Sequence, residues 1–143
     1  MPQNSAPPDN PLEMRVGYQL RRASVAMMAD LSKALEPLGL RTVEASILIL
    51  IGANGGITQT ALGRSLDIQR ANMVPLTAGL MARGLVEREA ADGRSHALRL
   101  TGKGRLLAAR IDRIMRQHEQ RCTRDWTAAQ RKAVIALMRT IWE

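Results

Sequence analysis

The sequence QRANMVP, at residues 69–75, carries two kinds of side chain that suit recognition of DNA bases. Arginine, glutamine and asparagine present forked hydrogen-bonding groups that match the edges of guanine and adenine. Valine and proline offer apolar surface that fits the methyl group of thymine. The hydrogen-bonding residues are Gln69, Arg70 and Asn72, and the apolar residues are Val74 and Pro75.

The spacing of the neighbouring apolar residues decides which way these side chains point. Met73, Leu76 and Leu80 fall at i, i+3 and i+7, which predicts a helix with these three residues on its inner face. A proline inside a helix costs about 3 kcal/mol. Pro75 is therefore interpreted in one of two ways: it supplies apolar surface and a bend on the DNA side, or it is a tolerated kink without a DNA contact.

The composition favours a nucleic-acid partner over catalysis. The formal net charge is +8, with 21 Lys and Arg against 13 Asp and Glu, which indicates an anionic partner, nucleic acid before membrane, or else a generally basic surface. The chain has one cysteine, two histidines and no glycine-rich phosphate loop, so we expect no enzyme, no metal and no cofactor. It lacks a long apolar run and a signal peptide, so we expect a cytoplasmic protein.

The N-terminal third is expected to contain a tail and two helices. Residues 1–11 are polar and proline-rich and predict a disordered tail. Asn10, Pro11 and Glu13 resemble a helix start with a capping box, and the first helix should end near Pro37. Thr42 is expected to cap a second helix, VEASILILIGA, whose apolar character all round predicts burial.

The middle of the chain predicts two short helices and a β-hairpin. Thr58 should cap a helix over residues 59–65, and a fourth helix should cover residues 69–83 with Gly84 at its C-terminal end. The period then changes to two on both sides of the sequence ADGR, which carries an Asp-Gly turn signal.

The C-terminal part predicts two amphipathic helices. Thr101 should begin the fifth helix and Thr127 the sixth, each with one apolar face. The expected fold is mostly α with a small β-hairpin wing, in the order ααααββαα. The expected inner face of the fifth helix comprises Leu107, Ile111, Met115, His118 and Cys122, and that of the sixth comprises Val134, Leu137, Met138, Ile141 and Trp142.

Two helices joined by a tight turn and followed by a basic hairpin describe a winged helix-turn-helix. The second helix of such a pair enters the major groove with its N-terminal part. Arg94 at the hairpin tip suits a narrow minor groove, where Asp92 would hold it in place. Ser95 belongs to the same tip. Expected phosphate contacts, for which capping or solvated surface is the alternative, are Thr58, Gln59, Thr60, Arg64 and Lys103.

Three sequence segments together resemble the MarR family of winged helix-turn-helix regulators. These are PLGLRTVEASILILI, TQTALGRSLDIQRANM and LMARGLVEREAADGRSHALRLTGKG, and the resemblance covers about residues 12–143. Pro75 stands where the family often has a basic or polar residue, and the first helix lacks the cysteine of peroxide-sensing members. The residues that carry the resemblance most specifically are Leu80, Arg83 to Arg88, Asp92, Arg94, Leu100, Thr101, Lys103 and Gly104.

The resemblance implies a homodimer on a pseudo-palindromic DNA operator. Residues 12–38 and 101–143 would form the dimer interface, and residues 40–100 would form the winged helix-turn-helix domain. Many relatives are repressors that a small aromatic acid, or its thioester, releases from DNA. Candidate effector-binding residues, for several of which an ordinary core or surface role is the alternative, are Arg15, Tyr18, Arg22, Ser24, Met28, Met115 and His118.

Two other functions stay open at this point. One is a winged-helix module that binds another protein through a basic but merely solvated face. The other is a DNA-binding regulator with a thiol switch at Cys122, for which Arg121 and Arg124 are the only neighbouring charges in the sequence that favour a thiolate.

Overall fold

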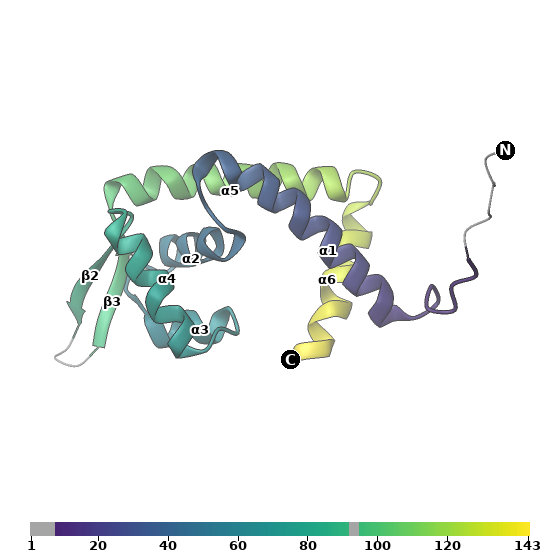
Figure 1. Ribbon diagram of the computed structural model, residues 1–143, viewed down its shortest axis with the longest axis horizontal. Helices are drawn as coiled ribbons and strands as arrows, with labels where there is room; N and C mark the ends of the chain where they lie inside the picture. The colour runs from purple at the N-terminus through teal and green to yellow at the C-terminus, as the bar shows by residue number, and fades with distance from the viewer. Residues whose placement is uncertain (1–7, 92–94) are drawn as a thin grey trace.

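The computed structural model describes residues 8–91 and 95–143 and has a winged part joined to a helical part by one long helix (Figure 1). That helix is α5 (Gly102–Cys122). It runs from the winged part to the opposite end of the molecule, which is formed by α1 (Val16–Leu35) and α6 (Ala128–Trp142). Within the described residues, no helix has the length and apolar character needed to cross a membrane.

The first helix begins later than the sequence indicated. The prediction of a capped start at Asn10 is wrong: α1 begins at Val16, and Arg15 is its extended N-cap residue. The Asn10 side chain instead accepts a hydrogen bond from the Leu12 amide and donates one to the Tyr18 hydroxyl. These bonds stabilise a separate turn ahead of the helix. The predicted end is confirmed, because a 3₁₀ helix, η1 (Glu36–Leu38), follows Leu35 and Gly39 has φ of +62°.

Helix α2 (Thr42–Ala53) forms the centre of the winged part. Ala45, Ile47, Leu48 and Ile51 are all buried, which confirms the burial predicted from its composition. Its N-cap is Arg41 rather than Thr42, because the Arg41 amide donates to the Glu44 carboxylate at 2.8 Å and satisfies the first turn.

Helices α3 (Gln59–Ser65) and α4 (Arg70–Ala82) form the predicted helix pair. The Thr58 hydroxyl accepts from the Ala61 amide, as expected for the N-cap of α3. Gly84 follows the C-cap of α4 with φ of +68°, a left-handed conformation that glycine adopts without a steric penalty. Both boundaries agree with the sequence prediction to within one residue.

The β-hairpin is confirmed and gains a third strand. Strands β2 (Val86–Ala91) and β3 (Ser95–Leu100) pair antiparallel, with Val86 opposite Leu100. The sequence did not reveal β1 (Ile57–Thr58), which pairs with the other edge of β3 and gives the order β1-β3-β2. A two-residue strand has no period to detect, so its pairing depends on Leu98 and Ala97 across from it.

The last two helices start where the sequence predicted. The Thr101 hydroxyl accepts from the Gly104 amide, and the Thr127 hydroxyl accepts from the Gln130 amide. On α5, Ile111 and His118 are buried as expected. Cys122 is exposed, so its assignment to the buried inner face is wrong: it is the last residue of α5, where the helix ends in solvent.

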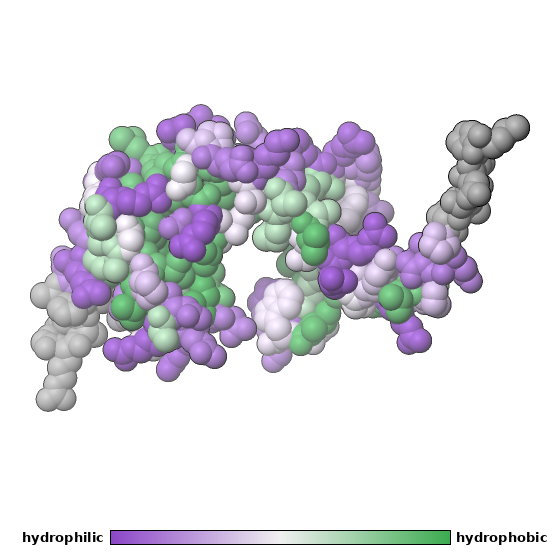
Figure 2. All heavy atoms as spheres, viewed as in Figure 1, coloured by the Kyte–Doolittle hydropathy of each residue, from purple (hydrophilic) through white to green (hydrophobic). Residues whose placement is uncertain are grey.

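Apolar side chains remain uncovered at the end of the molecule formed by α1 and α6. Figure 2 shows hydrophobic residues at the surface of this region. No residue of α6 is buried, although its sequence is strongly amphipathic. The apolar face of this amphipathic helix is therefore not buried within a single chain. The exposed large apolar residues here are Leu12, Met14, Val16, Trp126, Ile135, Leu137, Ile141 and Trp142.

The junction of the wing with α5 generates a prediction about Gly104. A Cβ atom at this position would overlap the Leu85 carbonyl oxygen, which also accepts the Thr101 amide, and would lie 3.3 Å from Leu100 Cβ. Gly104→Ala should lower the free energy of unfolding by about 1–3 kcal/mol or more through overpacking. Gly17→Ala on α1, where a Cβ meets nothing within 4 Å, should be neutral or stabilising by at most about 1 kcal/mol. Urea unfolding of both variants checks this, and equal stabilities would contradict the packing described.

Candidate nucleic-acid interface

Helix α4 presents to solvent the five residues that the sequence assigned to base recognition. Met73, Thr77 and Leu80 are buried and fix the inner face of the helix, with Leu76 half-buried beside them. The opposite face is therefore free to contact another molecule. Its exposed residues are Gln69, Arg70, Asn72, Val74 and Pro75.

Pro75 lies inside α4 and on its exposed face. Because proline has no amide hydrogen, the Ala71 carbonyl four residues earlier lacks its usual helical donor. Pro75 also lines a shallow groove with Arg41, Val43, Asn72 and Leu76, which joins the start of α2 to α4. Its position favours the first of the two sequence interpretations, apolar surface on the recognition side, and a DNA contact by this residue stays a prediction.

A second groove separates α3 from the start of α4. Its lining includes Thr60, Arg64, Gln69 and Arg70, together with one acidic residue, Asp67, so two guanidinium groups and one carboxylate border the groove. Gly63 also lines the groove, and a Cβ there would lie 2.8 Å from the Ile68 carbonyl oxygen. The close approach of α3 to the following turn therefore keeps the two basic edges near each other. An arrangement of this kind suits a phosphate backbone.

Gln59 has an internal partner that the sequence did not reveal. Its side-chain amide donates to the hydroxyl of Thr77, which is fully buried on α4. The same hydroxyl lies 3.1 Å from the carbonyl oxygens of both Met73 and Val74. Gln59 thus ties the start of α3 to the middle of α4 instead of projecting freely towards a phosphate. A threonine at an inner helical position, four residues from Met73, was the available signal.

The other predicted DNA contacts are distributed unevenly. Thr60 and Arg64 are exposed on α3, and Thr58 serves as the N-cap, as its alternative interpretation stated. The Lys103 ammonium lies 3.0 Å from the Arg83 carbonyl oxygen at the end of α4, where it complements the helix C-terminus. Asp92 and Arg94 fall outside the described residues, and Ser95 is described only as the first residue of β3.

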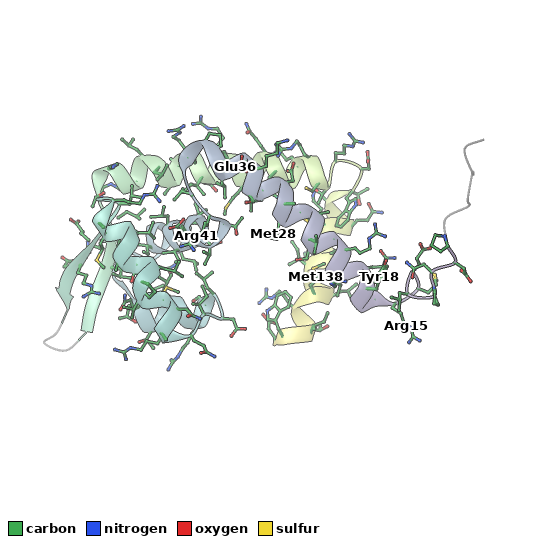
Figure 3. The ribbon with its side chains drawn as sticks, in the orientation of Figure 1. Arg15, Tyr18, Met28, Glu36, Arg41 and Met138 are labelled. Carbon is green, nitrogen blue, oxygen red and sulfur yellow. The ribbon has the colours of Figure 1, made fainter. Side chains whose placement is uncertain are left out.

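The candidate effector residues are spread along α1 rather than gathered in one place. The guanidinium carbon of Arg22 lies over the Tyr18 ring, 5.8 Å from its centre. Arg15 is the N-cap residue of α1 and is labelled at the N-terminal end of this helix in Figure 3. Met28 is labelled further along α1. Since a helix rises about 1.5 Å per residue, Arg15 and Met28 lie roughly 20 Å apart. One small aromatic acid in one chain cannot contact both.

The remaining candidates lie in the middle of α1 and in the C-terminal half of α5. Ser24 is exposed rather than turned to an apolar face, and Met28 is 45% exposed, while Met115 is half-buried against the core. His118 is 3% exposed, and its Nδ1 lies 2.8 Å from Asp30 Oδ2. The inner position of His118 was predicted correctly, and its carboxylate partner was missed.

Asp30 connects α1 to α5 through two bonds. Arg121 donates to the same Asp30 oxygen at 2.9 Å. The hydrogen bond with His118, followed by that from Arg121, holds the pKa of the Asp30 carboxyl below its usual value. The carboxylate is therefore ionised at neutral pH. The sequence carried no signal for this pairing, because 88 residues separate Asp30 from His118.

The hydrogen bond between Gln59 and Thr77 gives a prediction that distinguishes two roles for Gln59, holding α4 in place or contacting a phosphate. Gln59→Ala should weaken DNA binding by about 0.5–1.5 kcal/mol, the usual value of one hydrogen bond, by loosening α4. If Gln59 acts through Thr77, Gln59→Ala and Thr77→Val combined should cost less than the sum of the single changes. Fluorescence anisotropy of operator binding by the two single variants and the double variant measures this. Costs that simply add would instead support the independent phosphate contact expected from the sequence.

Comparisons with known proteins agree with this geometry. The sequence model described as the MarR family matches residues 38–95. The HTH-type transcriptional repressor Rv2887 of Mycobacterium tuberculosis is 31% identical over 119 residues, which cover 82% of this chain and 86% of that protein.

Two solved structures of the transcriptional repressor CouR show similar folds. CouR bound to a 23-mer DNA duplex has a TM-score of 0.88 and 34% identity, covering 97% of this chain and all of that one. CouR bound to p-coumaroyl-CoA has a TM-score of 0.78 at the same identity, covering 88% and 90% of the two chains. With a winged helix-turn-helix, a basic exposed recognition face and these relatives, the chain belongs to the MarR family of transcriptional regulators.

Proposed function

We propose that this regulator is a sequence-specific repressor that binds a DNA operator as a homodimer and is released by a small aromatic acid or its thioester. The observation that carries the proposal is the exposed face of α4, where Gln69, Arg70 and Asn72 project beside the basic groove of α3. CouR, the repressor that this chain resembles at 34% identity, is bound to a DNA duplex.

Side-chain chemistry indicates which residues of this face would contact phosphates and which would contact bases. Arg64 and Thr60 on α3 suit phosphate contacts, which fix the register of a protein on the duplex without reading sequence. Arg70 and Asn72 lie on the recognition helix, where forked donors discriminate guanine and adenine in the major groove. Val74 and Pro75 add the apolar contact that suits thymine. The same arrangement argues against a protein-interaction module, because the exposed charge lies where the duplex backbone would run.

The uncovered apolar face supports dimerisation through residues 12–38 and 101–143. Trp142 is 69% exposed and Leu137 is 68% exposed, although both lie on the apolar side of an amphipathic helix. A second copy of the chain would cover such a face and place two winged domains, residues 40–100, on one DNA molecule. Two-fold symmetry then suits two inverted half-sites.

The effector is proposed from the open space between the winged part and α6, below α1, which Figure 2 shows from one side. Met28 is exposed and is labelled on α1 beside this open space in Figure 3. CouR binds p-coumaroyl-CoA, a thioester of an aromatic acid. A ligand seated here would contact both parts of the molecule and alter the placement of α4. Such a regulator acts on chromosomal DNA in the cytoplasm and needs no catalysis of its own.

DNA recognition can be tested by exchanging one side chain of each kind. Asn72→Ala should relax the preference at one base position and weaken operator binding by about 1–3 kcal/mol. Arg94→Ala should weaken binding to all sequences and reduce the slope of affinity against salt. Fluorescence anisotropy over a salt series measures both effects.

Arg113→Ala provides the matched control, because it removes the same charge from the exposed surface of α5, away from α3 and α4. This variant should bind as the wild type does. If Asn72→Ala and Arg94→Ala also bind as the wild type does, the proposed docking is wrong.

Release by the effector can be tested by calorimetry against benzoates, cinnamates and their coenzyme A thioesters. A ligand that binds should weaken DNA affinity by about 1–3 kcal/mol, and DNA should weaken ligand affinity by the same amount. Met28→Ala should reduce ligand affinity and leave DNA affinity without ligand unchanged. Leu106→Ala, at a position 74% exposed near the start of α5, is the control. The absence of binding, or binding without reciprocal coupling, would contradict the effector proposal.

A further inference from the structure

Three potential metal ligands converge where α1 meets the C-terminal end of α5. Asp30 Oδ2 lies 2.8 Å from His118 Nδ1, and Cys122 Sγ lies 3.7 Å from the same nitrogen. The three donor atoms all lie within 4.8 Å of one another. Neither the recognition face of α4 nor the open space proposed for the effector uses this cluster.

We propose that Asp30, His118 and Cys122 form a binding site for a borderline-soft divalent cation such as Zn²⁺. Zinc binds cysteine sulfur at about 2.3 Å and histidine nitrogen or carboxylate oxygen at about 2.0–2.2 Å. Tetrahedral geometry at those bond lengths places neighbouring donor atoms about 3–4 Å apart. The separations of 2.8 Å and 3.7 Å at His118 Nδ1 require only small side-chain rotations to match.

The spacing along α5 adds to the geometry. His118 and Cys122 are four residues apart, so both side chains lie on one side of the helix. His118 is buried and held in orientation, while Cys122 and Asp30 are exposed. A cation can therefore approach from solvent and find the imidazole already placed. Three protein ligands would leave the fourth position to water.

The chemistry of the donors selects the kind of cation. Thiolate and imidazole ligands suit Zn²⁺ and related transition metals, whereas Mg²⁺ and Ca²⁺ prefer oxygen ligands alone. On binding, the Cys122 thiol releases its proton to solvent. The His118 imidazole gives up its Nδ1 hydrogen and takes up a proton on Nε2, so it stays neutral and the cation occupies the position between Nδ1 and Asp30. The carboxylate is already ionised. No oxidation or reduction takes place.

Arg121 competes with the cation for Asp30. Its guanidinium donates to the same carboxylate oxygen at 2.9 Å, and both side chains are about half exposed. A bound cation would displace Arg121 and connect α1 to α5 by coordination bonds in place of this ion pair. Removing the arginine should therefore strengthen cation binding, although a purely structural cluster would be weakened by the same change.

The test uses the reduced, chelator-treated full-length protein and two probes, Co²⁺ and Zn²⁺. Co²⁺ should produce a thiolate-to-metal absorption band in the near ultraviolet, and C122S should abolish it. Competition with a chromophoric chelator should show Zn²⁺ affinity at least about 10-fold lower in D30N and H118Q, because loss of a group that only orients a ligand already costs about 10–100-fold. R121Q should bind Zn²⁺ more tightly than the wild type.

H96Q is the control, because it removes the only other histidine of the chain, in strand β3. It should bind both probes as the wild type does. The proposal is overturned if Co²⁺ gives the wild type no thiolate band, or if Zn²⁺ affinity is the same in C122S. It is equally overturned if R121Q binds Zn²⁺ no better than the wild type.

Discussion

The structure depends on the burial of α2, a helix that carries apolar residues on every side. Ile47 and Leu48 are fully buried and Ile51 almost so, and the helix contacts α1, α3, α5 and strand β3. A helix of this composition has no face for water, so neighbouring elements must enclose it. The residues of α1, α3 and α5 that do so form one continuous core with those of the wing. Figure 1 shows α2 in the middle of this arrangement.

The packing around α2 determines which faces of α3 and α4 remain exposed to solvent. Leu62 of α3 and Met73 and Leu80 of α4 are drawn into the core, which leaves the opposite faces of both helices in solvent. Those faces carry the arginines and amides that suit DNA. The link between Gln59 and Thr77 adds a polar bond between α3 and α4 and restricts their relative movement. The recognition residues are thus carried by two helices that a shared core and one polar bond hold together.

Helix α5 connects this pair of helices to the opposite end of the molecule. Its first turn packs on the wing through Gly104, its middle packs on α2 through Ile111, and its last turns meet α1 at His118. One helix therefore passes through the winged core and the region of uncovered apolar residues. A change at the α1–α5 junction has a direct physical route to the wing.

Local patterns in the sequence predicted most of the helices and the hairpin. Thr58, Thr101 and Thr127 are true caps, because an N-cap uses atoms within three residues of itself. The outward face of α4 followed from a short apolar period. The start of α1 was predicted wrongly because Asn10 caps a turn as readily as a helix.

Partners distant in the chain could not be predicted from such patterns. Asp30 and His118 meet only because α1 and α5 pack together, and Thr77 receives Gln59 only because α3 crosses α4. Strand β1 is defined by its pairing with β3 and has no period of its own. The effector residues predicted along α1 do not lie in one place. The chemical type of a residue carries no information about its position, and Arg15 and Met28 lie at distant points of the same helix.

We infer that two copies of one recognition unit read DNA together. Selection of bound sequences from a random duplex library by the protein is the decisive measurement. The expected result is an enriched pseudo-palindrome with two inverted half-sites about 10 base pairs apart from centre to centre, or a multiple of one helical turn. Enrichment of a single half-site, or of no sequence at all, would contradict it.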